Sequence, residues 1–413
     1  MGNTNSNFNY KEYLYKYPDL IPAGINTHEK ALNHFINHGK KEGRTCTPLN
    51  FDWIQYLQNY PDLTSAGIDT RDKALNHFIN HGKKERRLCT PLKTIINNIS
   101  ILNRLLNFNI TNKKLQYDYT NIDINKIYVP PYGVLLKIKN NNISILRENK
   151  GTFFPDQVYN DRFIPFYNYL KKLDISNINL LCIFIYSDTI LKNNNSLIDL
   201  DLVNNIININ LPICVSSMNI NLYKIAKNVF LIPNFYTYSN NIPINKVIDD
   251  DIQFDLKTNK AMGAFSNTSQ NRVQLKKWSI GKQKIEIKLK SLFYSIPGLT
   301  NKDDTTIKEQ LNYKYLISMD GCVTSWNGLI WKMYSNSLVI KEKTNCIEYW
   351  YFLLNNNNII EFELNNMDKI INIVDNNYKN DNMLKEQQNI AKIITSEETT
   401  NTYLIDLFRK LSN

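Results

Sequence analysis

Two patterns of hydrophobic and polar positions divide the chain near residue 126. Residues 1–93 carry apolar side chains at helical spacing, broken by Gly and Pro. Beyond residue 126, short apolar runs alternate with helical stretches, and residues 179–188 form a nearly continuous apolar run that stops at a polar end. Runs of this kind are typical of central strands in parallel sheets. The pattern predicts a small all-α module followed by a larger α/β region.

The first 93 residues contain an internal repeat. The segment YPDLIPAGINTHEKALNHFINHGKKEGRTCTPL at residues 17–49 returns as YPDLTSAGIDTRDKALNHFINHGKKERRLCTPL at residues 60–92. Thr27 and Thr70 are predicted helix N-caps, and Gly39 and Gly82 are predicted helix ends. Because two helical units are few for a free-standing solenoid, we expect them to pack against each other or against the next domain.

All five histidines lie in this module, four of them as i, i+4 pairs, His34 with His38 and His77 with His81. That spacing places two imidazoles on one helix face, where they could share a metal ion. No Glu or Cys completes either pair at matching spacing, so partly buried polar positions are the favoured interpretation. The six cysteines include no CxxC pair, which excludes the usual zinc modules and makes a disulfide scaffold improbable.

The rest of the chain predicts two successive series of strands and helices. The first opens with a hairpin around residues 140–142, and its strand-like runs are residues 179–188, 211–217 and 228–235. The runs of the second are residues 260–266, 284–289, 314–321, 336–341 and 359–364. Such alternation predicts an α/β fold with two doubly wound, Rossmann-type lobes. The expected domains are the repeats at 1–93, a linker with a helical start at 94–125, and lobes at 126–250 and 251–413.

Ligands of doubly wound sheets collect beyond the carboxyl ends of the strands. That rule selects the residues that end four of the predicted strands: Asp188, Ser216, Ser217, Ser266, Asp320 and Gly321. A helix is expected to open near residues 324–325, and the free N–H groups at its start favour an anion. An Asp-Gly turn followed by a Thr or Ser N-cap explains the same residues without a ligand, and both interpretations stay open.

The segment KYLISMDG, followed by SNSLVIK and EYWYFLL, resembles the signature block of family 90 glycosyltransferases, the capsule-associated and protein O-glucosyltransferase group. Upstream, AMGAFSNTSQNRVQLKKW stands where that family has an aromatic-Arg-Gly-Ser loop, and IFIYSD where it has the strand that ends at its catalytic aspartate. In order and spacing the resemblance covers roughly residues 128–411, and the block at 314–351 is its most specific part. The N-terminal repeats are similar to modules found beside enzyme domains in proteins of large DNA viruses, a resemblance that implies an accessory role, such as docking another protein.

The resemblance implies a GT-B-like pair of lobes, a UDP-sugar as co-substrate, no metal or other cofactor, and inversion at the anomeric carbon. The sugar would be of the glucose or xylose class, and the acceptor a hydroxyl of a glycan or a protein. Asp188 aligns with the family's general base, and no histidine follows residue 81 to take that role. The matching donor-binding positions are Ser266, Asn267, Thr268, Arg272, Asp320, Gly321, Ser325 and Asn327.

Two family arginines are replaced, by Ala264 in the first loop and by Asn327 at the helix start. Their loss removes a large share of the expected phosphate clamp. Arg272, Lys276 or Lys332 could compensate. The alternative is a catalytically inactive relative that serves as a carbohydrate-binding or scaffolding protein.

The net charge is +11, from 49 Lys and Arg against 38 Asp and Glu. No basic stretch is interleaved with aromatic residues, so a nucleic-acid partner is not expected. The Asp199-Leu-Asp201 string mimics a metal-binding DxD motif but lies in an amphipathic helical pattern with solvated acids, so no metal is expected there. Neither a signal peptide nor a membrane span is predicted, which makes the cytoplasm the default location.

Overall fold

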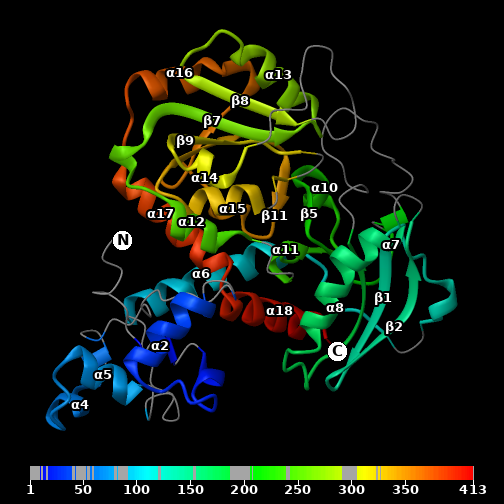
Figure 1. Ribbon diagram of the computed structural model, residues 1–413. Helices are drawn as coiled ribbons and strands as arrows, with labels where there is room; N and C mark the ends of the chain where they lie inside the picture. The colour runs from blue at the N-terminus through cyan, green and yellow to red at the C-terminus, as the bar shows by residue number, and fades with distance from the viewer. Residues whose placement is uncertain are drawn as a thin grey trace. The chain divides into compact units, whose positions relative to one another are not determined.

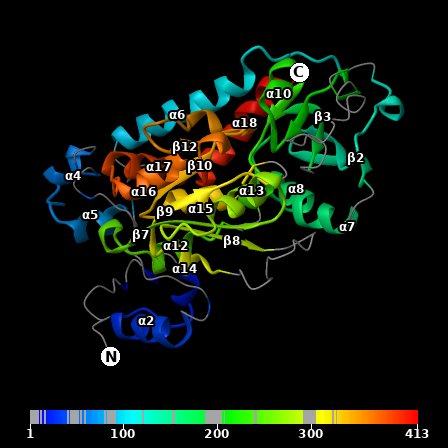
Figure 2. The same cartoon turned by 90° about the horizontal axis from the view of Figure 1, so that it is seen from above.

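The computed structural model describes residues 10, 13–14, 17–39, 42, 53, 56–57, 60–78, 81, 92–119, 122–151, 155–186, 205–206, 208–238, 242–290, 305–321, 324–325 and 327–412. Its contacts divide the chain into two compact units, Met1–Ile101 and Leu102–Asn413, which Figures 1 and 2 show from two directions. Within its described part, no helix is both long and apolar enough to cross a bilayer.

The two repeats of the first unit fold alike. The first contains η1 (Pro18–Leu20), α2 (His28–His34) and the π-helical turn η2 (Phe35–Gly39), and the second contains α4 (Pro61–Ser65) and α5 (Arg71–His77). Thr27 and Thr70 are the N-caps of α2 and α5, as predicted. Each repeat packs a small core of its own, around Tyr13 in the first and Tyr56 in the second.

Two of the five histidines, one in each repeat, take structural positions, whereas the other three are exposed. The Nδ1 atom of His34 lies 3.0 Å from the hydroxyl of the buried Tyr13, and His77 stands in the same relation to Tyr56. Gly39 is needed for a reason other than the predicted one: its φ is not positive, but a Cβ there would collide with the Tyr13 hydroxyl. The structure therefore favours the packing interpretation of this module.

Helix α6 (Leu92–Ile110) follows the repeats and contains the predicted helical start of the linker. Its last turn is anchored in the α/β unit. The buried Asn109 donates from Nδ2 to the carbonyl oxygen of Tyr349 at 3.2 Å and accepts from the Tyr223 hydroxyl at 3.0 Å.

The first lobe is a mixed five-stranded sheet with the order β2-β1-β3-β4-β6. Its strands are β1 (Gly133–Lys139), β2 (Asn142–Asn149), β3 (Asn179–Ile185), β4 (Ile213–Val215) and β6 (Val229–Leu231). The strands β3, β4 and β6 are parallel, whereas the predicted hairpin β1–β2 adds two antiparallel strands at one side. The helices of this lobe are η4 (Ile124–Lys126), α7 (Pro155–Val158), η5 (Tyr159–Phe163), α8 (Ile164–Leu170), α10 (Ile220–Ile225) and α11 (Phe235–Tyr238).

The second lobe is a fully parallel sheet with the order β12-β10-β9-β7-β8. Its strands are β7 (Thr258–Ser266), β8 (Ile285–Lys290), β9 (Tyr313–Ser318), β10 (Leu338–Glu342) and β12 (Ile360–Phe362). Numbered along the chain, this is the doubly wound order 2-1-3-4-5, whose ligand position is the switch point between the first and third strands. Those strands are β7 and β9.

Helices connect and cover the strands of the second lobe. They are α12 (Ile244–Asp250), η6 (Phe254–Leu256), α13 (Gln270–Ser279), α14 (Ile307–Gln310), α15 (Asn327–Tyr334), η8 (Leu364–Asn366), α16 (Asp368–Asp375) and α17 (Asp381–Ile394). Trp331 of α15 is buried with Met262 and Leu316 in one apolar cluster. The predicted α/β class, with two Rossmann-like lobes, is confirmed.

An antiparallel ladder joins the carboxyl edges of the two sheets. β5 (Ser217–Asn219) begins two residues after β4 ends, and it pairs with β11 (Cys346–Glu348), which follows β10 after a short turn. Residues 348–354 have a helical pattern in the sequence but form no α-helix, because the segment begins with the last residue of β11 and continues into the short 3-10 turn η7 (Tyr351–Leu353). The ladder holds the carboxyl ends of β4 and β10 next to each other.

Helix α18 (Glu397–Leu411) returns from the second lobe to the first. The Tyr403 hydroxyl donates to the carbonyl oxygen of Leu231 at 2.6 Å, and Ser412 bonds to both backbone groups of Asn179. These contacts fix the last helix to the parallel strands of the first lobe, so the ladder and α18 are two separate ties between the lobes.

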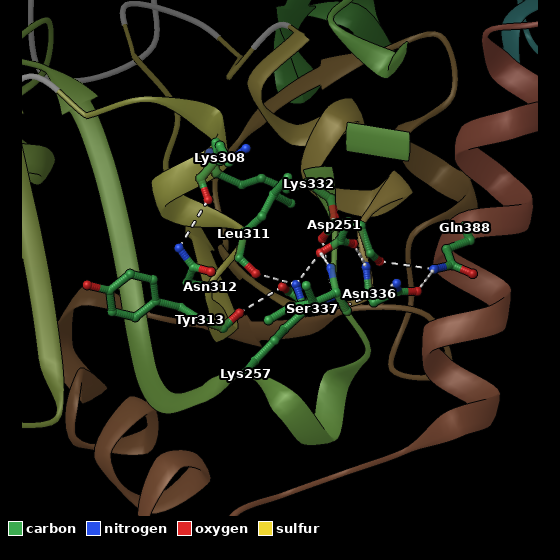
Figure 3. Close-up of polar contacts among 12 residues, drawn as sticks. Asp251, Lys257, Lys308, Leu311, Asn312, Tyr313, Lys332, Asn336, Ser337 and Gln388 are labelled. Atoms are coloured by element: carbon green, nitrogen blue, oxygen red, sulfur yellow. Dashed lines mark hydrogen bonds and ion pairs between the residues drawn. The ribbon is translucent and has the colours of Figure 1, made fainter. Parts of the chain in front are cut away.

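The amino ends of the central strands of the second lobe are held by a buried polar network (Figure 3). Lys257, just before β7, donates to the Asp251 carboxylate and to the carbonyl oxygen of Leu311, and Asp251 also accepts the N–H of Asn336. The Lys257 and Asp251 side chains are 0% and 6% exposed. Burial lowers the pKa of Lys257, an effect that Asp251 opposes.

We predict that Asp251→Asn destabilises the protein by about 3–5 kcal/mol, because it leaves the buried Lys257 ammonium without its counter-charge. The double variant Asp251→Leu/Lys257→Met removes both charges and should lose less stability than the single one. Urea unfolding of the three proteins tests this. A single variant as stable as the wild type would contradict the burial of the pair.

Candidate functional site

Three of the residues selected by the strand-end rule, Ser266, Asp320 and Gly321, lie where β7 and β9 end. Arg272, in the first turn of α13, spans this point: Nη1 donates to the carbonyl oxygen of Ser266 at 2.9 Å, and Nη2 to that of Met319 at 2.8 Å. Nη1 also donates to Thr268 Oγ1 at 2.8 Å. Arg272 thus ties the loop after β7 to the end of β9, and part of its donor capacity serves this backbone connection.

Gly321 is the residue that lets the two loops come this close. A Cβ at this position would lie 2.8 Å from Thr268 Oγ1 and 3.2 Å from Arg272 Nη2. The loops are held further by Ser269, the N-cap of α13, whose hydroxyl donates to the carbonyl oxygen of Asp320 at 3.2 Å. A side chain larger than hydrogen at residue 321 would therefore push apart the two loops that form the switch point.

Asp320 is buried two residues after the end of β9. Only one of its two carboxylate oxygens has hydrogen-bond partners among the described residues. Oδ2 accepts from the Thr344 hydroxyl and from Lys341 Nζ, the latter at 3.4 Å. Oδ1 is buried and has no hydrogen-bond partner among the residues that the structure describes. Because a buried acceptor without a partner costs free energy, such an oxygen in a native protein calls for an explanation.

Glu342 is a second buried carboxyl at this edge. Its Oε2 accepts the backbone N–H of Asp320 at 3.2 Å, and its Oε1 accepts from Asn271 Nδ2. Burial and the nearby negative charge of Asp320 raise the pKa of Glu342 to about 7. Glu342 is therefore partly protonated near neutral pH, which reduces the negative charge of the edge.

Lys332, on α15, brings a buried cation to the same region. Its side chain reaches back toward the helix start, where a Cβ on Gly328 would lie 3.8 Å from Nζ, and Nζ is 5.8 Å from the centre of the Phe265 ring at the end of β7. Within the described residues, Nζ makes no hydrogen bond and no ion pair. Burial, with repulsion from Arg272, lowers the pKa of Lys332 to about 7.

The first residues after β9 are fixed from the ladder that joins the lobes. The fully buried Glu348 of β11 accepts from the Thr324 hydroxyl at 2.6 Å and from Trp350 Nε1 at 3.1 Å, and the Tyr236 hydroxyl of the first lobe donates to it as well. Burial raises the pKa of Glu348 to about 6. Trp350 and its neighbours Tyr349 and Tyr351 are buried, so they form core rather than an exposed aromatic wall.

The structure gathers most of the predicted donor-binding residues at one edge. Ser266, Asn267, Thr268 and Arg272 lie on the β7 side, Asp320 and Gly321 on the β9 side, and Ser325 and Asn327 lie before and at the start of α15, with the Ser318 hydroxyl donating to Ser325 Oγ at 3.2 Å. Asp188, with the Asp199-Leu-Asp201 string, lies outside the described residues, and β3 before it ends at Ile185. The binding and catalytic roles of all these residues stay predictions.

Sequence reasoning left Lys341, Glu342, Thr344 and Glu348 out of the site. A signal for the first two existed, because an apolar strand ends in two adjacent charges on the side where ligands of parallel sheets gather. Lys276, one of the three residues considered as a replacement for the missing arginines, donates to the carbonyl oxygen of Ile287 on β8. No group of three or more His, Cys, Asp or Glu side chains in the described part could hold a metal ion.

No protein-family model and no curated protein matches the sequence. Among solved structures, the chain is similar to the crystal structure of TarM, a wall teichoic acid glycosyltransferase, with a TM-score of 0.34 and 16% identity. The match covers 53% of this chain and 48% of TarM, so the chain spans about half of that protein. The resemblance to family 90 stays a prediction, and we base the functional proposal on the geometry of the edge.

Glu342 gives a prediction about the pH dependence of stability. Its pKa in the folded protein, about 7, lies above the ordinary value of 4.5, so the folded state binds the proton more tightly than the unfolded state. Its contribution to stability is full below pH 4.5 and is lost as the pH rises through 7. The free energy of unfolding should therefore decrease less between pH 5 and 8 in Glu342→Gln than in the wild type, by on the order of 1–3 kcal/mol.

Thermal unfolding at several pH values measures this change. The exposed Glu363, which also follows a strand of this sheet, gives the control Glu363→Gln. Because the pKa of Glu348 is raised as well, the decrease in stability with rising pH should become smaller in Glu342→Gln but should not disappear. A Glu342→Gln profile parallel to that of the wild type would show that Glu342 does not carry the effect.

Proposed function

We propose that the protein is a glycosyltransferase that binds a nucleoside diphosphate sugar at the switch point between β7 and β9. The observation that carries the proposal is the buried side chain of Lys332, whose Nζ lies beside the first turn of α15 and near the Phe265 and Trp331 rings but makes no hydrogen bond or ion pair with the described residues. A buried charge is unfavourable unless something compensates it. A diphosphate bound at this edge would supply the missing negative charge, and the N–H groups of the helix start would add to its binding.

Asp320 supports the same assignment, as a hydrogen-bond acceptor rather than as a cation. Its oxygen Oδ1 is an acceptor without a partner, and Lys341 already balances its charge. A carboxylate repels phosphate but accepts hydrogen bonds from hydroxyl groups. The ribose or the transferred sugar of a nucleotide sugar carries such hydroxyls, so one ligand class would satisfy both Lys332 and Asp320.

The ladder β5–β11 joins the carboxyl edges of the two lobes, which supports a transfer between two substrates bound at these edges. Asp188 follows β3 on that lobe and would serve as the general base. In this step, the acceptor oxygen bonds to the anomeric carbon as the bond from that carbon to the diphosphate oxygen breaks. The acceptor proton passes to Asp188, and Lys332 stabilises the charge that develops on the leaving diphosphate.

The resemblance to family 90 glycosyltransferases supports a more detailed proposal for the donor, the acceptor and the stereochemistry. The donor would be a UDP-sugar of the glucose or xylose class, the acceptor a hydroxyl of a glycan or protein, and the transfer would invert the anomeric centre without a metal. The repeats would dock a further protein.

Lys332→Met tests the donor site. We expect the variant to bind UDP roughly 10–100-fold more weakly, because a buried charge-assisted hydrogen bond is lost. Without ligand it should be more stable than the wild type by about 1–4 kcal/mol, since an apolar side chain of similar length replaces a buried charge. Calorimetry with UDP and thermal unfolding of the unliganded protein measure the two effects.

The matched control is Lys314→Met. Lys314 is also buried, but its Nζ donates to Asn377 Oδ1 from the first half of β9, away from the carboxyl edge. This variant should bind UDP as tightly as the wild type. Unchanged UDP affinity in Lys332→Met, with normal folding, would overturn the donor-site assignment.

Asp188→Asn tests the catalytic step separately. We expect kcat for transfer from the active UDP-sugar to fall by roughly 10²–10⁴-fold, while UDP affinity and the melting temperature stay close to those of the wild type. A panel of UDP-sugars, screened first by thermal shift, identifies the donor for this assay. Full activity in the variant would exclude Asp188 as the base.

One observation favours a binding protein without catalytic activity. The two arginines that family 90 places at the phosphates are Ala264 and Asn327 in this chain, and Arg272 is partly engaged with backbone carbonyl groups. Under this alternative, the wild-type chain would bind UDP or a glycan but give no turnover with any donor of the panel.

A further inference from the structure

A cluster of cations lies on the first lobe, where the segment after α6 meets the end of α10. The backbone N–H of Lys114 donates to the carbonyl oxygen of Lys227 at 2.9 Å. Lys113 Nζ donates to the carbonyl oxygens of Tyr223 and Ala226, at 2.6 Å and 2.8 Å. These contacts hold cations of the two segments together. We call this cluster the basic patch, and it consists of Lys113, Lys114, Lys224 and Lys227.

The described part of the chain does not balance the charges of the basic patch. Residues 86–117 and 202–248, which contain both segments, include no Asp and no Glu. Within the described residues, none of the four lysines forms an ion pair, whereas exposed lysines elsewhere do, as Lys284 does with Asp375. Burial, with repulsion from Lys227, lowers the pKa of Lys113 to about 7. The patch is therefore a local excess of positive charge, which attracts an anionic partner.

An exposed isoleucine stands within the basic patch. Ile225, between Lys224 and Lys227 in the chain, is 57% exposed. A single exposed apolar side chain is ordinary on a protein surface, but one among four cations gives the combination by which peripheral proteins bind anionic membranes. A basic surface for single-stranded nucleic acid would instead offer rings for base stacking. The neighbouring rings of Tyr117 and Tyr223 are buried, so the observations favour a membrane.

We propose that the basic patch and Ile225 bind the surface of a bilayer that contains anionic lipids. The headgroups supply the negative charge that this part of the chain lacks, and Ile225 enters the boundary between headgroups and acyl chains. Four lysines and one isoleucine make a small site, because basic clusters that bind such membranes contain roughly four to eight cations. Binding is therefore weak, reversible and sensitive to salt.

The basic patch is separate from the proposed donor site. Lys227 stands two residues before β6, at the amino edge of the first sheet, whereas the donor site lies at the carboxyl edge of the second. No residue assigned to the donor site or to the catalytic step belongs to the patch. Lipid binding therefore needs neither a nucleotide nor turnover, and this inference is independent of the proposed function.

The test is co-sedimentation of the full chain with vesicles of phosphatidylcholine alone and of phosphatidylcholine with about one third phosphatidylserine, an anionic lipid. We expect binding only to the anionic vesicles. Binding should be weaker at about 0.15 M salt than at about 0.01 M, because the Debye length falls from about 30 Å to about 8 Å.

Two variants of the basic patch test its residues. Lys224→Gln/Lys227→Gln should weaken binding roughly 10–30-fold, since each lysine near an anionic membrane contributes about a factor of five. Ile225→Ser should weaken it about three- to tenfold, because the serine side chain gains little on entering the acyl boundary.

Two matched controls change the same kinds of residue elsewhere. Lys171→Gln/Lys172→Gln removes two adjacent exposed lysines at the end of α8, and Ile280→Ser removes an isoleucine that is 72% exposed. Both variants should bind anionic vesicles as the wild type does. Because every substituted side chain is exposed, the melting temperatures of all four variants should stay close to that of the wild type.

Three results with vesicles would overturn the proposal. The first is the absence of binding to anionic vesicles at low salt. The second is an equal loss of binding in Lys224→Gln/Lys227→Gln and in the lysine control, which would show an effect of net charge alone. The third is undiminished binding by Ile225→Ser. Single-stranded RNA that binds through Lys224 and Lys227, when vesicles do not, would also overturn it and identify a nucleic acid as the partner.

Discussion

The short ladder between β5 and β11 is the constraint on which the functional geometry depends. Each of its strands follows a parallel strand after only a few residues, β5 after β4 and β11 after β10, so pairing them brings two carboxyl edges together. Ligands of parallel sheets bind at carboxyl edges. A ladder of three residue pairs therefore turns two separate sheets into one region where two substrates can meet.

The ladder is also where the polar interior of the two lobes is connected. Glu348, its last residue, holds Tyr236 of the first lobe and Thr324 of the second with one carboxylate. A change at this residue would act on the lobe junction and on the loop after β9 together. Arg272 acts one strand further along, where it fixes the ends of β7 and β9 to each other through their carbonyl groups. Glu348 and Arg272 thus shape the site through hydrogen bonds to other groups of the protein. Binding of a ligand would fall to other side chains.

The sequence predicted the strands of both lobes because their apolar runs are continuous and end abruptly. It also predicted which loops follow the carboxyl ends of β7 and β9, since the switch-point rule needs only strand ends and not side-chain contacts. It failed at β11, because Cys346–Glu348 is a three-residue strand whose pairing with β5 is set by tertiary contact. The role of Lys332 could not be read from the sequence either, because a lysine among apolar helix positions looks the same whether its ammonium reaches solvent or is buried.

Three of the four buried lysines described in the second lobe show that burial by itself does not indicate a function. Lys257 is paired with Asp251 at the amino edge, and Lys341 with Asp320 at the carboxyl edge, so the protein itself balances both charges. Lys332 has no such partner among the described residues, and its pKa is lowered to about 7. A protein that needed only a well-packed core would gain stability from an apolar side chain at this position. An anion bound from outside the chain at the carboxyl edge, as we propose for the donor diphosphate, would balance the charge of Lys332.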